Sequence, residues 1–231
     1  MSKAWIFQGK PEIWDVRAGV NQFETMNWGV DNVFSPRRTV TIFGALTATL
    51  IVIGTPVAGP WDDGVAAIQR GDYATALPIW HRLADQGDLR AVVYLGYMYQ
   101  NGWGVPQDYV AAVSWFRRAA ELGDTNGQNS LGLAYAEGRG VAQDYTVAVS
   151  WLRRAAEHGD AVAQNNLGWM YFYGYGVPQD FVNAHMWINL GAANGDPEHL
   201  KSRNFVAERM TPAQIAEAQR LAREWKPKRE R

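Results

Sequence analysis

Residues 88–123 read DLRAVVYLGYMYQNGWGVPQDYVAAVSWFRRAAELG, and closely similar stretches follow at residues 124–159 and 160–195. The chain therefore repeats with a period of 36 residues. Thirteen positions are identical in all three copies, which in the first copy are Asp88, Leu95, Gly96, Tyr99, Gly102, Gly104, Val105, Gln107, Asp108, Ala112, Trp115, Ala120 and Gly123. A fixed period of this size is typical of proteins whose units bury their apolar faces against one another.

The first half of each copy predicts a helix, which in the first copy covers residues 89–101. Asp88 precedes this helix as a suitable N-cap, because its carboxylate accepts hydrogen bonds from the free backbone N–H groups of the first turn. Gly96 has no side chain, so a second helix can approach closely at this point. Gly102 suits a left-handed C-terminal cap, and Gly104 suits a bend in the loop that follows.

The second half of each copy predicts a second helix. In the first copy Asp108 caps it, and Trp115 lies between small residues on the face toward the core. Because these residues recur at every period, we assign them to structure rather than to catalysis. The positions assigned to structure are Asp88, Gly96, Gly102, Gly104, Asp108, Trp115, Asp124, Gly132, Gly138, Gly140, Asp144, Trp151, Asp160, Gly168, Gly174, Gly176, Asp180 and Trp187.

The copies predict an all-α fold, a right-handed α–α superhelical solenoid of helix-turn-helix repeats, because neither helix of a unit can bury its apolar face alone. Residues 60–87 are interpreted as a degenerate entry repeat. Their second half supports this, since residues 71–88 align with residues 107–124 and place Trp80 over Phe116. Terminal repeats are often atypical, because one of their sides faces solvent.

Residues 196–226 are interpreted as a partial repeat and a capping helix, followed by a tail at 227–231. A helix is expected at about 197–209. Thr211 and Pro212 then give an N-cap followed by proline at the first helical position. One face of the closing helix is marked by Ile215, Ala218, Ala222 and Trp225.

Residues 1–38 lack sustained periodicity and mix both charges, which predicts an unstructured extension. Residues 39–59 carry no charge and are largely apolar. They follow Arg37 and Arg38, as the apolar core of an export signal follows a basic segment. The basic segment has an ordinary length if translation starts at Met26 rather than at Met1.

An uncleaved transmembrane anchor is the alternative for the same stretch. Residues 39–58 supply the roughly 20 residues that a spanning helix needs. A signal-peptidase site near residue 58 is weakened by Pro56 and Pro60. With Arg37 and Arg38 held in the cytoplasm by the positive-inside rule, the repeats lie across the membrane in either case.

Composition and motifs argue against several classes of function. The 22 basic and 23 acidic residues give a net charge of −1, which lacks the positive excess typical of nucleic-acid-binding proteins. The chain contains no cysteine, which excludes disulfides, thiolate metal sites and cysteine nucleophiles. Its four histidines form no metal-binding pair, and the recurring Gly-x-Gly pairs follow helices rather than a strand, so they predict turns and not a nucleotide site. We therefore expect no cofactor, no metal and no catalytic residue.

The segment LGYMYQNGWGVPQDYVAAVSWFRRAAELGD, residues 95–124, resembles the Sel1-like repeat, a relative of the tetratricopeptide repeat with a slightly longer unit. The shared pattern is A-x-x-x-L-G-x-x-Y-x-x-G-x-G-V-x-x-D-x-x-x-A-x-x-W. The resemblance covers residues 88–195 strongly and 71–87 partly. It implies a scaffold that binds a protein or peptide partner, since such proteins commonly act as adaptors, including regulators in the bacterial envelope.

The resemblance and the apolar segment together predict an exported interaction scaffold, periplasmic or secreted. The alternative is a membrane-tethered structural component, anchored in the inner membrane through residues 39–58 with its repeats outside the cytoplasm. A third hypothesis is an enzyme directed at beta-lactams, an activity described for some cysteine-rich members of the family. The absence of cysteine and of any nucleophile constellation argues against an enzyme.

Positions that differ among the three copies are the candidates for partner contact, because the repeat itself does not fix them. The first helices of a solenoid line its concave surface, where ligands commonly bind. Aromatic and arginine side chains supply most binding hot spots. The candidate contacts are therefore Trp103, Arg139, Phe172, Tyr173 and Tyr175. For Phe172 and Tyr175, packing on the adjacent loop is an equally good interpretation.

Overall fold

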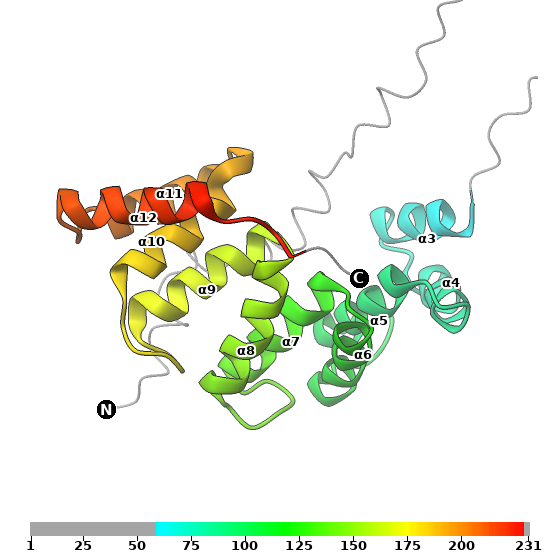
Figure 1. The fold of residues 1–231 in the computed structure, drawn as a ribbon. Helices are drawn as coiled ribbons and strands as arrows, with labels where there is room; N and C mark the ends of the chain where they lie inside the picture. Colours follow the sequence, from blue (N-terminus) through cyan, green and yellow to red (C-terminus); the bar gives the residue numbers. More distant parts are fainter. Residues whose placement is uncertain (1–58, 229–231) are drawn as a thin grey trace, which may run out of the picture. The chain divides into compact units, whose positions relative to one another are not determined.

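The computed structural model describes residues 59–228, and this part of the chain is helical throughout, without a strand (Figure 1). The unstructured extension predicted for residues 1–38 and the signal or anchor predicted from residue 39 to 58 lie outside the described residues. The helices are α3 (Pro60–Gln69), α4 (Tyr73–Asp85), α5 (Leu89–Asn101), α6 (Tyr109–Glu121), α7 (Thr125–Glu137), α8 (Tyr145–Glu157), α9 (Ala161–Tyr173), α10 (Phe181–Gly191), the 3-10 helix η2 (Ala192–Asn194), α11 (Pro197–Ala207) and α12 (Pro212–Glu224).

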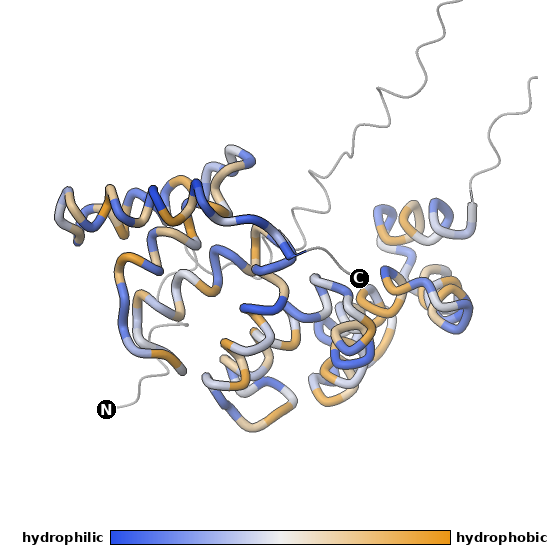
Figure 2. Tube along the Cα trace, in the orientation of Figure 1, coloured by the Kyte–Doolittle hydropathy of each residue, from blue (hydrophilic) through white to orange (hydrophobic). Residues whose placement is uncertain are grey.

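The helices pack in the order that a solenoid requires. Each repeat pairs its two helices, α5 with α6, α7 with α8 and α9 with α10. The second helix of a repeat then packs on the first helix of the next, as α6 does on α7 and α8 on α9. Hydrophobic and hydrophilic residues are interspersed along the helices (Figure 2), as elements with one buried face require. The predicted α–α solenoid is confirmed.

A glycine inside each first helix lets the second helix of the same repeat pack closely. A Cβ atom added at Gly96 would collide with the ring of Phe116, and one at Gly132 would lie 2.8 Å from Cγ of Leu152. The entry unit has the same contact, because a Cβ at Gly64 would lie 2.7 Å from the Trp80 ring. The first half of this unit matches the repeat pattern poorly, because only three residues separate α3 from α4 where seven separate α5 from α6.

Aspartates cap the helices as predicted. Asp88, Asp124 and Asp160 accept hydrogen bonds from backbone N–H groups in the first turns of α5, α7 and α9. The second helices α6, α8 and α10 are capped in the same way by Asp108, Asp144 and Asp180. Each cap satisfies N–H groups that have no partner inside the helix.

The loop between the two helices of a repeat depends on its pair of glycines. Gly138 ends α7 with a φ of 70°, and Gly140 has a φ of 73°, which is the left-handed region that side chains disfavour. A Cβ atom at Gly140 would also collide with the backbone carbonyl of Tyr109 at the start of α6. The second glycine thus seats each loop against the start of the preceding repeat's second helix.

The closing helix explains why the second half of the third copy differs in sequence from the first two copies. Helix α12 packs chiefly on α10, the second helix of the third repeat. Met186 on α10 is only 8% exposed, whereas Ser114 and Ser150 at the equivalent positions of the first two copies are exposed. The change from serine to methionine therefore matches the extra cover that α12 provides.

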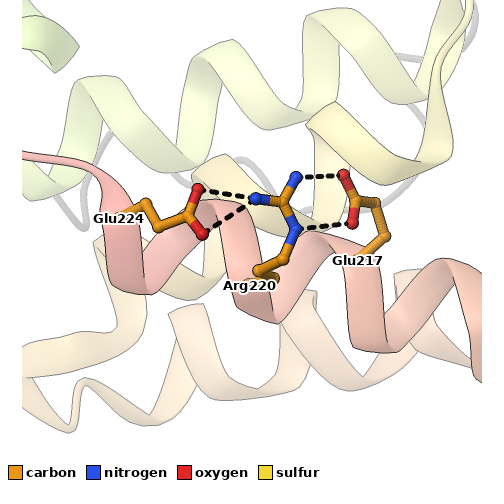
Figure 3. Close-up of polar contacts among 3 residues, drawn as sticks. All are labelled: Glu217, Arg220 and Glu224. Carbon is orange, nitrogen blue, oxygen red and sulfur yellow. Dashed lines mark hydrogen bonds and ion pairs between the residues drawn. The ribbon is translucent and has the colours of Figure 1, made fainter.

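The outer face of α12 is polar and carries its own ion pairs (Figure 3). Arg220 donates to the carboxylates of Glu217 and Glu224, one turn away on either side, with N–O distances of 2.6 Å. The hydrogen bonds and charges of the two carboxylates raise the pKa of the Arg220 guanidinium, and the hydrogen bond and charge of Arg220 lower the pKa of Glu217. Because all three side chains are exposed, the network marks a solvent-facing surface more than a source of stability.

The N-cap aspartates differ in their electrostatic surroundings. Burial raises the pKa of the Asp160 carboxyl from 3.8 to about 6, with a smaller contribution from the negative charge of Asp124. At the equivalent position of the first repeat, the hydrogen bond and charge of Arg90 hold the pKa of Asp88 below its usual value. The same cap therefore opposes folding by its charge in one repeat and favours it in another.

We expect the substitution Asp160→Asn to raise the free energy of unfolding by about 1–2 kcal/mol at pH 7.5, because asparagine caps nearly as well and carries no buried charge. The folded chain binds the Asp160 proton below about pH 6, whereas the unfolded chain binds it below about pH 4. The gain should therefore shrink as the pH falls from 6 to 4. Urea unfolding across this range measures it.

The matched control is Asp88→Asn, whose effect should have the opposite sign. Because the folded pKa of Asp88 is lowered, its charge stabilises the fold at neutral pH, and this contribution is lost as the pH falls through that folded pKa. Equal, pH-independent losses for both variants would contradict the electrostatic difference between the two caps.

Candidate partner-binding surface

The loop-tip position of each repeat lies against the second helix of the preceding unit. The Trp103 ring stacks on Tyr73 at the start of α4, with ring centroids 5.7 Å apart and planes 2° apart. Tyr175 stacks in the same way on Tyr145 at the start of α8, at 4.7 Å. Between them, the guanidinium of Arg139 lies 5.9 Å from the ring of Tyr109. One side of every loop-tip residue therefore couples adjacent repeats.

The candidates of the third repeat belong to an aromatic cluster. Phe172 is only 7% exposed and packs edge-on against Tyr173, with centroids 4.9 Å apart. Tyr173 also stacks on Trp169, at 5.7 Å. Phe205 of α11 adds a further ring, and the guanidinium of Arg209 lies 3.7 Å above it. The cluster joins the third repeat to α11 through its rings, in addition to the hydrogen bond between the His199 ring and the Gly191 carbonyl at 2.9 Å.

The five candidates differ in how much surface they offer to a partner. Phe172 and Tyr175 are 7% and 8% exposed, and both contact their own chain, which agrees with the packing interpretation of these two positions. Trp103 and Tyr173 keep part of their surface exposed. The Arg139 side chain is 45% exposed and forms an ion pair with Glu137 at 3.0 Å. Arg139, Trp103 and Tyr173 are therefore the candidates with surface available for recognition.

Other positions that vary among the copies hold the repeats together. Gln128 donates to the carbonyl of Ala120 at 3.3 Å, and Gln164 donates to the carbonyl of Ala156 at 3.1 Å. Both glutamines are buried, and each ties a first helix to the preceding second helix. At these positions, variation among copies thus reflects local packing. Variation alone is therefore a weak guide to which residues contact a partner.

Neighbouring first helices are also joined by buried polar contacts. The amide of Asn166 on α9 donates to the Asn129 side chain on α7 at 2.9 Å. One repeat earlier, the Tyr97 hydroxyl on α5 and the Ser130 hydroxyl on α7 are 3.0 Å apart. Burial raises the pKa of Tyr97 to about 12, so its hydroxyl stays protonated. A buried polar row of this kind fixes how the first helices sit beside one another.

Two features of this surface were not predicted from the sequence. The first is the tyrosine at the start of α4, α6 and α8, against which the loop tip of the next repeat lies: Tyr73, Tyr109 and Tyr145. The recurrence of tyrosine at one position of the repeat was the signal that could have predicted this contact. The second is the C-terminal segment after α12, which was expected to be a tail but contacts the end of α8 through Lys228. Only tertiary structure reveals that contact.

Within residues 59–228 no group of three or more histidine, aspartate or glutamate side chains is placed to hold a metal ion. In the same range, no helix has the length and apolar character needed to cross a bilayer. The arrangement of exposed aromatic and arginine side chains on a stack of helix pairs is suited to recognising another chain.

Comparison with known proteins identifies the repeat. The Sel1 repeat model matches residues 89–124, 125–160 and 161–196. A solved structure of a protective antigen from uropathogenic Escherichia coli, described as having an SLR fold, is similar with a TM-score of 0.62 and 29% identity. That match covers 70% of this chain but only 39% of the antigen, so the similarity spans less than half of that protein.

A second solved structure, a Sel1 repeat protein from Oxalobacter formigenes, has a TM-score of 0.54 and 26% identity over 69% of this chain and 72% of that one. A search of curated protein sequences gave no match. Sel1 repeat proteins typically mediate protein–protein interactions. The period, the capped helix pairs, the glycine loops and these similarities lead to one conclusion: residues 89–196 are three tandem Sel1 repeats.

Proposed function

We propose that this protein is an exported interaction scaffold that holds an extended or helical segment of a partner protein on the face formed by its first helices. The observation that supports the proposal most is the position of Arg139. Its guanidinium is exposed at a loop tip, yet the ion pair with Glu137 and the ring of Tyr109 hold it in place. Such preorganised arginines lose little entropy on binding.

Trp103 and Tyr173 extend the proposed contact surface to the neighbouring repeats. Each is anchored on one side by a stacked ring and keeps part of its surface exposed. A partner segment that crosses several repeats would meet one of these side chains per unit. Trp103 and Arg139 also contact the preceding unit, through Tyr73 and Tyr109, which fixes the spacing between these two contacts.

Export is the second part of the proposal and rests on the sequence. Arg37 and Arg38 precede an apolar, uncharged stretch at residues 39–58, in the order found in export signals. The similarity to a protein described as a protective antigen agrees with a location outside the cytoplasm. The partner is then expected to be a protein of the same compartment.

The contact surface is tested by site-specific photo-crosslinking in envelope extract. A photoreactive residue at position 139 or 173 should capture the same partner, whereas one at position 223, on the outer face of α12, should not. Arg139→Glu should reduce capture at position 173 about tenfold or more, since an arginine hot spot contributes about 2 kcal/mol. Arg223→Glu is the charge-matched control. Equal capture by both variants, with unchanged unfolding curves, would rule out this surface.

The export proposal is tested separately by mass spectrometry of the mature chain. We expect purified envelope fractions to contain a chain that begins near Gly59. A chain that keeps residues 39–58 and sediments with membranes would instead support the tethered component. Recovery of the intact chain in the cytoplasmic fraction would contradict export in both forms.

A further inference from the structure

The chain's own C-terminal segment shows how an extended peptide binds the second-helix side of a repeat. After α12 the backbone turns extended at Trp225, with φ −66° and ψ 142°. The Trp225 ring packs edge-on against Trp187 of α10, with centroids 6.0 Å apart. Lys228 then reaches the end of α8, where its N–H donates to the Glu157 carbonyl at 2.8 Å and its ammonium pairs with the Glu157 carboxylate at 2.6 Å.

We call Glu157, Gly159 and Trp187 the tail site. Gly159 belongs to it because a Cβ atom added there would lie 3.8 Å from Cβ of Pro227. The site combines an aromatic surface, a glycine over which proline passes, and an acceptor pair formed by one glutamate's carbonyl and carboxylate. Its ligand is therefore an aromatic residue followed three positions later by lysine, with proline directly before the lysine.

The repeat places the same three residue types one unit earlier. A shift of 36 residues turns Glu157, Gly159 and Trp187 into Glu121, Gly123 and Trp151, with no change of residue type. We call these three residues the counterpart site. The backbone at Gly123 and Gly159 is also alike, with φ values of 95° and 94°. The groups that hold the tail therefore recur in similar local geometry at the junction of the first and second repeats.

Exposure distinguishes the counterpart site from the tail site. Glu121 is exposed and forms no ion pair with residues 59–228, whereas the Glu157 side chain is 27% exposed and pairs with Lys228. Leu122, beside Glu121, is 60% exposed and is one of two large apolar side chains exposed in the described part of the chain. An accessible carboxylate next to an accessible leucine suits the same ligand chemistry as the tail.

One further unit toward the N-terminus, the equivalent residues Asp85, Gly87 and Trp115 are engaged differently. His81 packs edge-on against Trp115 at 5.7 Å, and Arg118 donates to the carbonyl of Ala84 at 3.3 Å. Side chains of the repeats themselves thus contact this first version of the site. The three versions therefore differ in the side chains that contact them: His81 and Arg118 at the first, Arg154 at the middle one, and Trp225 and Lys228 at the tail site.

We propose that the counterpart site binds an extended segment of a partner protein that carries an aromatic residue followed three positions later by lysine, in the manner of Trp225 and Lys228. The lysine pairs with Glu121 and the aromatic ring packs on Trp151. This surface lies on the second helices, so it is separate from the contact surface around Arg139 and does not depend on it.

Arg154 decides how strongly the counterpart site binds. Its guanidinium lies 5.7 Å from the ring of Trp151, on the residue that the incoming aromatic side chain must reach. The equivalent position on α10 is Leu190. With leucine there, the Trp187 ring is available for packing by Trp225. The incoming ring must therefore displace Arg154 or stack on it. Removing this arginine makes the counterpart site match the tail site.

The proposal is tested with a synthetic peptide of residues 222–228, AREWKPK, added to the isotope-labelled full-length chain. We expect the backbone amide signal of Gly123 and the indole signal of Trp151 to shift on titration. Glu121→Gln should weaken binding at least threefold, and Arg154→Leu should strengthen it about threefold. Replacing the peptide's tryptophan by alanine or its lysine by glutamate should abolish the shifts.

Glu157→Gln is the matched control, because it alters the tail site and leaves the counterpart site intact. It should free the chain's own Lys228 without weakening the shifts at Gly123. Two results would overturn the proposal: peptide-induced shifts confined to Gly159 and Trp187, which would mean exchange with the chain's own tail, or shifts at Gly123 that Glu121→Gln and Arg154→Leu leave unchanged. Both substitutions are at exposed positions, so the variants are expected to fold.

Discussion

The fold depends on the docking of each glycine loop against the repeat before it. Gly140 and Gly176 bring the loop backbone so close to Tyr109 and Tyr145 that no side chain fits, and the residue beside each glycine then lies over the same tyrosine ring. Such contacts join units that are sequential neighbours, so stability in this architecture accumulates from one interface to the next. Aspartate caps and close helix pairs build each unit, but the loops determine how units follow one another.

The same coupling limits where a partner can bind. A side chain at a loop tip has one face in the interface between repeats, so only its other face is available for recognition, and Phe172 and Tyr175 retain almost none. The ends of the second helices impose no such constraint. There the C-terminal segment already demonstrates peptide binding within the chain, through Trp225 on Trp187 and Lys228 on Glu157. The two surfaces therefore differ in kind. The loop-tip surface is preorganised, but part of it is buried in the interfaces between repeats. The surface at the ends of the second helices is open and recurs along the chain.

Much of the fold could be predicted from the sequence, because the residues that determine it recur with a fixed period. The caps at Asp88 and Asp108 and the turn at Gly102 follow from local backbone chemistry and recur in every copy. The entry unit was predicted at residues 60–87 mainly from its second half, since a shorter loop breaks the period in its first half. Partner contacts were harder to predict: a position such as Gln128 varies among copies yet is buried between helices, and variation alone does not separate packing from recognition.

Gly140→Ala measured against Gly71→Ala tests the role of the loops most directly. Both glycines have the same left-handed backbone, with φ values of 73° and 72°, but nothing lies within 4 Å of a Cβ atom at Gly71. We expect Gly71→Ala to lower the free energy of unfolding by about 1 kcal/mol and Gly140→Ala by about 2–4 kcal/mol, since only the second adds a collision with the preceding repeat. Equal losses in urea unfolding would contradict the claim that loop docking holds the repeats together.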